Sequence, residues 1–277
     1  MKVSVKYWRS SMAVVMVFMA LIMSAPMVFA DNINPGVLAI DAKLGGQTYG
    51  QWSENWWQWA YSVTTPNFDD CPNQSGRMWF LTGAVRLITG PQTPVGSQPT
   101  ETTVRNCTVP AGKNIMFPVF NFEQSIAEAE GGATTGNLPG STCPLRDVNG
   151  NLITGTDYDS LLRCAQAFTQ HVFNKGVSLG VEVNGHALKS LTQYRAASPS
   201  PLFPFTAVKG NPIGLCELLG SCPLPTKAAS DGFWIILGPD RLPHGMNTIH
   251  FTASVPFPEP NLNFTYINDV TYNLMVK

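Results

Sequence analysis

The sequence predicts a mainly β fold: an antiparallel β-sandwich of jelly-roll type, stabilised by disulfides and carrying two peripheral α-helices. The chain has 24 glycines and 22 prolines among 277 residues, which is typical of many short strands joined by turns. Apolar and polar side chains alternate from Val270 to Val276, and a chain that closes on a regular strand favours a sandwich or barrel. Six cysteines, an even number, indicate a disulfide framework.

The other strands are predicted where side chains are continuously apolar or alternate. They are expected at residues 78–81, 115–120, 177–183, 233–237 and 247–253. The Asn-Gly pair at 184–185 predicts a tight turn, and the Pro-, Gly- and Thr-rich residues between 81 and 107 predict a long hairpin or surface loop. A helix is expected over about 157–174, capped by Thr156 or Asp157.

A second helix is expected over about residues 49–64, which contain four of the seven tryptophans. Trp52, Trp56 and Trp59 are spaced i, i+4 and i+7, so they share one helix face and are predicted to be core residues. Trp57 lies about 100° away from that stripe. Two interpretations therefore stay open for Trp57, a place in the core or a place in the wall of a groove.

Residues 1–30 have the pattern of a secretory signal peptide. Three basic residues lie within the first nine, and the apolar run over residues 12–23 is too short for a bilayer span of about 20 helical residues. Val28 and Ala30 are small residues that a signal peptidase reads, which predicts cleavage after Ala30; the alternative is an uncleaved anchor. We therefore expect one domain over residues 31–277, no membrane span in the mature chain, and a periplasmic or extracellular location.

Cysteine usage agrees with export, because disulfides form in oxidising compartments. The six cysteines all follow residue 30: Cys71, Cys107, Cys143, Cys164, Cys216 and Cys222. Nearness in sequence favours the pairs Cys71–Cys107, Cys143–Cys164 and Cys216–Cys222, although six cysteines allow other connectivities. Their spacing lacks the paired knuckles of a zinc site, so no metal is expected.

Several phrases of the sequence are distinctive. They are Trp56-Trp57-Gln58-Trp59, Gly76-Arg-Met-Trp-Phe-Leu81, Cys107-Thr-Val-Pro-Ala-Gly-Lys113 with Phe117-Pro118, and the ending Asp231-Gly-Phe-Trp234, Gly245-Met-Asn-Thr-Ile-His250 and Asp269-Val-Thr-Tyr272. With these motifs the chain resembles a group of exported bacterial proteins of unknown function, over most of residues 49–276. The resemblance implies export and a single structural unit, and it implies no activity.

Composition and missing motifs exclude several function classes. Charged residues make up only 13% of the chain, with 17 basic and 18 acidic side chains, so no basic face for nucleic acid is expected. Neither G-x-x-x-x-G-K-[ST] nor G-x-G-x-x-G occurs, and no cofactor is therefore expected. The four histidines lack zinc-site spacing, and no G-x-S-x-G nucleophile elbow occurs.

Candidate site residues are acids and amides beside predicted strands. Glu123, Glu128 and Asp231 are the candidate catalytic acids, because a glycosidase needs two carboxylates about 5–9.5 Å apart. Trp57, Asn121 and Glu123 are the candidate ligand-binding residues. The competing interpretation is that the acids only keep a weakly charged surface soluble. They also lack the spacing of an EF-hand calcium loop.

These features favour an exported sandwich that binds an extracellular or envelope ligand, either a glycan or a peptide. The alternative is a polysaccharide hydrolase that uses a carboxylate pair, such as Glu123 with Glu128 or Asp231. A third possibility is a structural component of the envelope or matrix. Two acids facing each other in a deep groove would favour the hydrolase, whereas a flat Trp-lined face without paired acids would favour binding.

Overall fold

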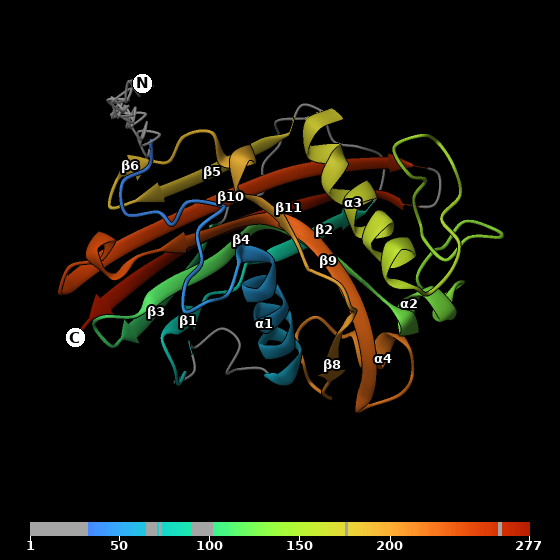
Figure 1. Ribbon diagram of the computed structural model, residues 1–277, viewed down its shortest axis with the longest axis horizontal. Coiled ribbons are helices and arrows are strands. Elements are labelled where there is room, and N and C mark those ends of the chain that lie inside the picture. The colour runs from blue at the N-terminus through green and yellow to red at the C-terminus, as the bar shows by residue number, and fades with distance from the viewer. Residues whose placement is uncertain (1–32, 65–70, 72–73, 90–101, 175–176, 260–261) are drawn as a thin grey trace, which may run out of the picture. The chain divides into compact units, whose positions relative to one another are not determined.

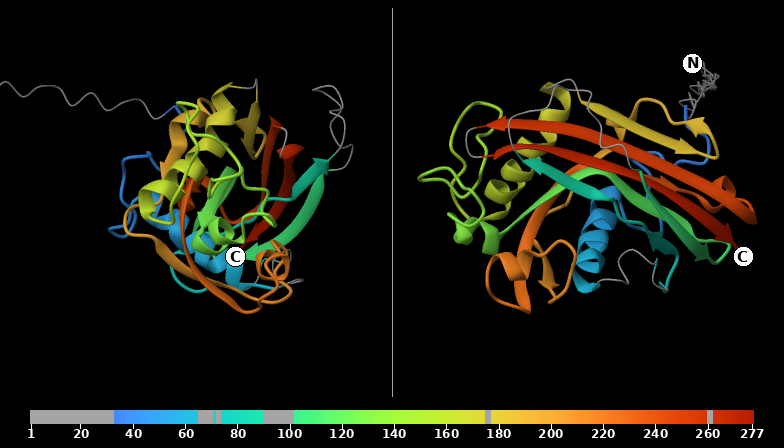
Figure 2. Two further views of the ribbon diagram at one scale, coloured as in Figure 1. Left: turned by 90° about the vertical axis from the view of Figure 1, so that its right-hand side faces the viewer. Right: turned by 180° about the vertical axis from the view of Figure 1, so that it is seen from behind.

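The computed structural model describes the chain except for residues 1–32, 65–70, 72–73, 90–101, 175–176 and 260–261. The predicted signal peptide and the middle of the segment between 81 and 107 therefore lie outside the described residues. The expectation of a long hairpin or surface loop in that segment is wrong, because its described ends form strands at Val85–Thr89 and Thr103–Val109 that both pair with Leu262–Val276. The described residues belong to one compact unit, Asn32–Lys277. The fold is mainly β, with 39% strand and 22% helix, and its strands form two sheets (Figures 1 and 2).

The first sheet has the strand order β1-β4-β9-β7, and β8 also pairs with β9. Its strands are β1 (Met78–Phe80), β4 (Asn114–Ser125), β9 (Leu224–Leu237), β7 (Arg195–Ala197) and β8 (Phe203–Ala207). The second sheet has the order β2-β11-β10-β5-β6, and β3 also pairs with β11. Its strands are β2 (Val85–Thr89), β11 (Leu262–Val276), β10 (Gly245–Glu259), β5 (Ser178–Val183), β6 (His186–Ala187) and β3 (Thr103–Val109).

The prediction of a mainly β fold with two sheets and disulfides is confirmed, but the jelly-roll sandwich is not. Both sheets are mixed, because β1 runs parallel to β4 and β3 runs parallel to β11. The alternation of apolar residues shows which face of a strand is buried, and it says nothing about the direction of the neighbouring strand. Parallel pairs also need long connections, which separate the partners in the sequence.

The described residues form four helices rather than the two that were predicted. They are α1 (Tyr49–Ser62), α2 (Ile126–Gly131), α3 (Tyr158–Asn174) and α4 (Leu215–Leu218), with 3-10 turns at Leu191–Tyr194 and Pro239–Arg241. The two helices that were not predicted are too short to show a helical period. None of the helices among the described residues has the length and apolar content of a membrane span. The predicted cap of α3 is confirmed, because the Asp157 carboxylate accepts a hydrogen bond from the Ser160 amide at 3.0 Å.

Aromatic side chains fill the space between the two sheets. Phe117 of β4 stacks on Phe251 of β10 with ring centroids 4.5 Å apart, and Phe120 meets Tyr266 of β11 edge to face at 4.8 Å. These residues are fully or nearly fully buried. Burial of such large apolar surfaces is the main stabilising contribution to the fold.

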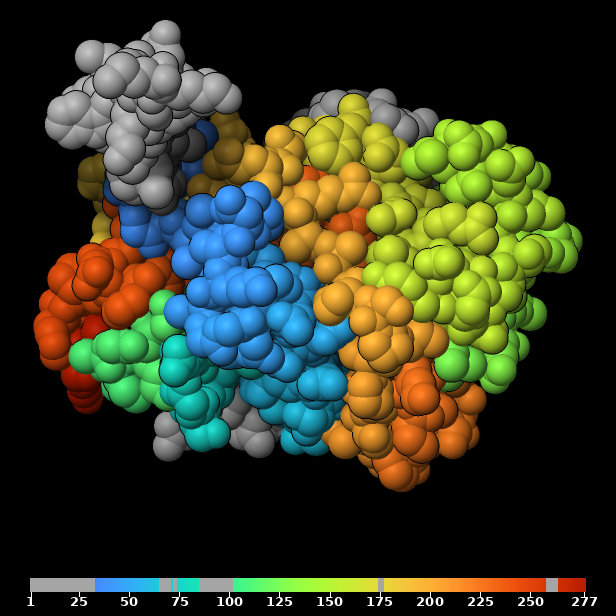
Figure 3. Space-filling model, in the orientation of Figure 1, coloured from blue at the N-terminus to red at the C-terminus, as the bar shows by residue number. Residues whose placement is uncertain are grey.

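Helix α1 packs against the first sheet. Trp56 contacts Trp234 of β9 at 5.4 Å, and the helix approaches β7 so closely that a Cβ on Gly50 would lie 2.1 Å from the Ala197 carbonyl oxygen. Figure 3 shows the α1 segment in blue lying against the orange residues that include β8 and part of β9. A glycine in this helix therefore allows backbone-to-backbone contact that no other residue would permit.

The predicted burial of the tryptophans is partly wrong. Trp52 and Trp56 are buried as expected, but Trp59 is only half-buried. Trp57, for which two interpretations were open, is only 7% exposed. The helix is covered on more than one side, so its buried arc is wider than a single i, i+4, i+7 stripe. Trp57 packs edge to face on Trp56 at 5.0 Å and stacks on Tyr61 at 5.6 Å.

All three predicted disulfides are present in the structure: Cys71–Cys107, Cys143–Cys164 and Cys216–Cys222. The first ties strand β3 to a residue that precedes β1. The second ties the loop before α3 to that helix, and the third closes a short loop between α4 and β9. The sheets therefore supply the core, and the disulfides fasten the segments around it.

Candidate functional site

A pocket of about 540 Å³ lies along one edge of β4. β1 pairs only with residues 114–116 of β4, so beyond Met116 the described residues give β4 a strand neighbour on one side only. A strand edge without a neighbour exposes side chains from both of its faces. Phe120 and Phe122 therefore line the pocket together with Asn121 and Glu123, although alternate residues point to opposite faces.

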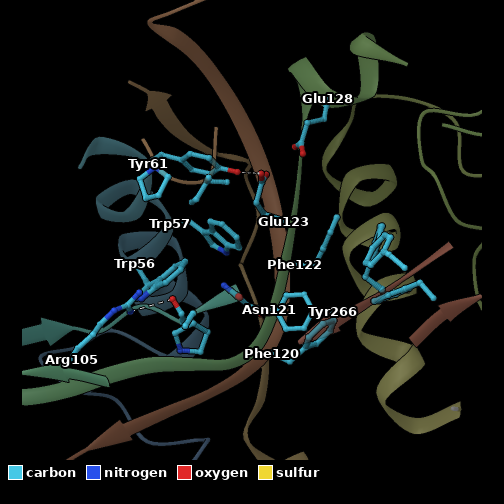
Figure 4. Close-up of a pocket in the computed structure, with 18 residues that line it drawn as sticks. Trp56, Trp57, Tyr61, Arg105, Phe120, Asn121, Phe122, Glu123, Glu128 and Tyr266 are labelled. Atoms are coloured by element: carbon cyan, nitrogen blue, oxygen red, sulfur yellow. Dashed lines mark hydrogen bonds between the residues drawn. The ribbon is translucent and has the colours of Figure 1, made fainter. Parts of the chain in front are cut away.

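The other walls come from segments that are distant in the sequence (Figure 4). Aromatic residues predominate, and they are supplied by α1, α3, β10 and β11: Trp56, Trp57, Tyr61, Phe168, Phe257, Phe264 and Tyr266. The remaining walls are Gly83, Ala84, Arg105, Pro118, Glu128, Pro212 and Ile213. Its volume and its mixture of apolar walls with a few polar groups are typical of a small-molecule site.

Glu123 is the most deeply buried acid of the pocket, with 3% of its surface exposed. Its Oε1 accepts a hydrogen bond from the Tyr61 hydroxyl at 2.5 Å, whereas its buried Oε2 has no hydrogen-bond partner among the described residues. Loss of hydration raises the pKa of this carboxyl well above its ordinary value, and the negative charge of Glu128 raises it further. Glu123 therefore tends to hold a proton.

Glu128 faces Glu123 from the first turn of α2 (Figure 4). Its Oε2 accepts hydrogen bonds from the amide and the hydroxyl of Ser125 at 2.8 and 2.7 Å, which completes a capping box. Burial also raises the pKa of Glu128, although the bonds from Ser125 oppose that shift. Among the described residues, no Lys, Arg or His forms an ion pair with either carboxylate.

Two buried N–H donors belong to the same pocket. The Asn121 side-chain Nδ2 and the Trp57 indole Nε1 have no hydrogen-bond partner in the described part of the chain. By contrast, the Trp56 indole donates to the Leu81 carbonyl at 2.9 Å. Asn121 lies directly over Gly232 of β9, where an added Cβ would come within 2.7 Å of the Asn121 Cβ. The glycine thus makes room for the amide that faces the pocket.

Arg105 lines the pocket but is engaged elsewhere. One of its guanidinium nitrogens donates to the Thr82 hydroxyl at 2.7 Å and to the Tyr272 hydroxyl at 2.6 Å. The guanidinium also lies 5.5 Å from the Tyr272 ring centroid, a cation–π distance. The positive charge therefore stabilises the junction between β3, β11 and the Thr82 segment, and it does not neutralise the acids.

Four of the residues singled out in the sequence lie together in this pocket: Trp57, Asn121, Glu123 and Glu128. Asp231 does not line it. Its Oδ2 accepts from Arg195 Nε at 2.8 Å and from the Thr169 hydroxyl at 2.6 Å, in a buried cluster between β9, β7 and α3. Asp231 is paired with Phe122 across the sheet, so its side chain lies on the face opposite to that of Glu123.

Sequence reasoning missed several lining residues. Tyr61 is four residues after Trp57, so the helical period alone places both side chains on one face. Arg105, Phe264 and Tyr266 carry no such signal, because only strand pairing between distant segments brings β3 and β11 beside β4.

A metal site is not supported by the described residues. Their one grouping of three potential ligands is Cys216, Glu217 and Cys222, and the two cysteines are joined in a disulfide. They therefore offer no thiolate to a metal. Comparisons with protein-family models, with curated proteins and with solved structures found no match to this chain. The functional conclusion therefore depends on the geometry of the pocket.

Proposed function

We propose that the protein binds a small saccharide, or the end of a longer one, in the pocket beside β4. The observation that carries the proposal is the convergence of three buried polar atoms without partners on one aromatic pocket: Trp57 Nε1, Asn121 Nδ2 and Glu123 Oε2. A buried polar atom that lacks a partner costs about 1–3 kcal/mol. Three of them in one place are best explained by a ligand that supplies the missing partners.

A saccharide matches both kinds of wall. The C–H faces of a pyranose ring pack on aromatic rings, which the pocket offers in Trp56, Trp57 and Tyr266. Its hydroxyl groups both donate and accept hydrogen bonds, as a site with two N–H donors and a carboxyl group requires. A purely apolar ligand would leave all three polar atoms unsatisfied.

The proposal is tested by screening the purified protein against neutral disaccharides by isothermal titration calorimetry. Trp57→Phe keeps an aromatic ring and removes the indole N–H, and Asn121→Leu keeps the size and removes the amide. Each variant should weaken binding by roughly tenfold, since a hydrogen bond is worth about 1 kcal/mol or more in a desolvated site. Trp59→Phe, on the same helix but outside the pocket, is the control. Failure to bind any of these neutral disaccharides, and failure to bind an amine-bearing one, would together refute the proposal.

A second candidate is hydrolysis of a glycosidic bond, and the facing acids favour it. Trp57 lines the same pocket as the carboxyl pair, and two facing acids are the feature expected to favour the hydrolase. Protonated Glu123 would donate its proton to the leaving oxygen, and the Glu128 carboxylate would activate a water molecule or attack the sugar carbon. We place this second, because the capping bonds from Ser125 already engage Glu128. If the wild type releases reducing ends from a polysaccharide and Glu128→Gln does not, hydrolysis becomes the first candidate and binding alone the second.

We also propose that the protein is exported. Three disulfides within the described residues support this, because such bonds persist in oxidising compartments. The predicted signal peptide and the resemblance to exported bacterial proteins agree with it. N-terminal sequencing of protein recovered from the periplasm or the medium should begin at Asp31. Recovery only from the cytoplasm, with free thiols and an intact N-terminus, would contradict the proposal.

A further inference from the structure

The two acids of the pocket lack a positive partner from the chain itself. Glu123 is buried and Glu128 is half-buried, and neither pairs with a basic side chain among the described residues. Each carboxylate that loses its hydration without a counter-charge is destabilised by several kcal/mol. The pair can avoid this cost by retaining a proton. A bound cation would remove the cost instead.

The residues that line the pocket indicate which kind of cation would bind there. Calcium takes six to eight oxygen ligands, and two carboxyl groups surrounded by indole and phenyl rings do not supply them. An ammonium group has three N–H donors, and it is attracted to the faces of Trp and Tyr rings within about 6 Å. The pocket combines both requirements, acceptors on Glu123 and Glu128 and aromatic rings on α1.

The unpartnered N–H donors show what else the ligand carries. Trp57 Nε1 and Asn121 Nδ2 both need an acceptor, which an ammonium group cannot provide. Asn121 and Glu123 are two residues apart on one face of β4, so their side chains project in the same direction, toward α1 (Figure 4). A ligand in contact with both must carry oxygen acceptors close to its positive group.

We propose that the saccharide bound in this pocket is an amino sugar with a free, protonated amine, held by Glu123 and Glu128 while its hydroxyl oxygens accept from Trp57 and Asn121. The inference deepens the proposed function and rests on it. It assigns the acids to recognition of charge, whereas the hydrolase candidate assigns them to proton transfer.

Three β-1,4-linked disaccharides of matched shape test the inference: the glucosamine disaccharide, its N-acetylated counterpart chitobiose, and cellobiose. They differ at the 2-position, which carries an ammonium, an acetamide or a hydroxyl group. Titration calorimetry at pH 7 should show the glucosamine disaccharide binding at least tenfold more tightly than the other two. Raising the salt concentration should reduce this preference, since it is electrostatic.

Two acid variants show which groups create the preference. Glu123→Gln and Glu128→Gln each remove a charge and keep the shape, and glutamine at position 128 can still complete the capping box with Ser125. Each should reduce the amine preference to threefold or less while cellobiose binding persists. Glu130→Gln is the matched control, because Glu130 is exposed on the same helix and does not line the pocket. Melting curves establish whether each variant is folded. If Glu123→Gln does not fold, Glu128→Gln alone is sufficient to test the inference.

The possible results separate the two proposals. Equal affinity for all three disaccharides, or tighter binding of a neutral one, would overturn the amino-sugar inference and leave saccharide binding intact. A preference for the amine that survives in folded Glu128→Gln would also overturn it. If none of the three disaccharides binds, and no other disaccharide of the neutral panel binds either, the proposed function itself is refuted.

Discussion

Replacing Trp56 with alanine should be among the most destabilising single changes in the chain. The indole is 4% exposed, donates to the Leu81 carbonyl at 2.9 Å, and meets Trp57 and Trp234 edge to face. Removal of a buried Trp costs about 3–5 kcal/mol through lost burial and the cavity left behind. The same change leaves a buried carbonyl without its donor, which places the expected loss at the upper end of that range.

Urea unfolding followed by far-UV circular dichroism measures the loss, and thermal melts provide a second estimate. A domain of this size loses about 2–4 °C of melting temperature per kcal/mol, so the midpoint should fall by roughly 6–20 °C. Trp59→Ala is the matched control, because Trp59 is the same residue type on the same helix but is half-buried. If both variants lose the same free energy, or if Trp56→Ala loses less than about 2 kcal/mol at an unchanged m-value, the packing account of α1 is wrong.

Three further changes can be tested together. Burial raises the folded-state pKa of Glu123 above its ordinary 4.5, so the contribution of Glu123 to stability is fully present below about pH 4.5 and is lost as the pH rises. In Glu123→Gln the melting temperature should therefore depend less on pH than in the wild type. Melting temperatures of the two proteins that change with pH in parallel would contradict this. Gly232→Ala should cost about 1–3 kcal/mol in urea, whereas Gly238→Ala, where the added Cβ lies 3.6 Å from its nearest neighbour, should cost much less. Serine replacement of Cys71–Cys107, with a separation of 36 residues, should cost about 2–5 kcal/mol and exceed the loss for Cys216–Cys222, with a separation of 6; the reverse order would exclude loop entropy as the cause.

Features that depend on local chemistry could be predicted from the sequence. The cap of α3 by Asp157, the strand ending at Val276 and the Cys216–Cys222 disulfide follow from residues that are close together in the chain. The turn at Asn184-Gly185 also follows, since both residues adopt positive φ between β5 and β6. In each case the signal and the structure occupy the same few residues.

Features that depend on distant pairing could not be predicted. Nothing near β3 indicates that it runs parallel to β11, and nothing near β1 indicates that it stops beside Met116 of β4. The pocket exists because of these two facts, so its residues were grouped only in part. Trp57 shows the same limit: its angle on the helix was predictable, but the second surface that buries it comes from other parts of the fold.

The contacts of helix α1 also constrain the order in which the chain can fold during its synthesis. Ribosomes release the chain from its N-terminus, so α1 emerges long before several of the segments that it contacts. The Tyr49 hydroxyl accepts from the Ile236 amide 187 residues later, and Asn211 donates to the Ala60 carbonyl across 151 residues. Until those segments emerge, α1 is an aromatic-rich segment with nowhere to dock. The pocket beside β4 is completed late, because its walls include Phe257, Phe264 and Tyr266 from the last two strands.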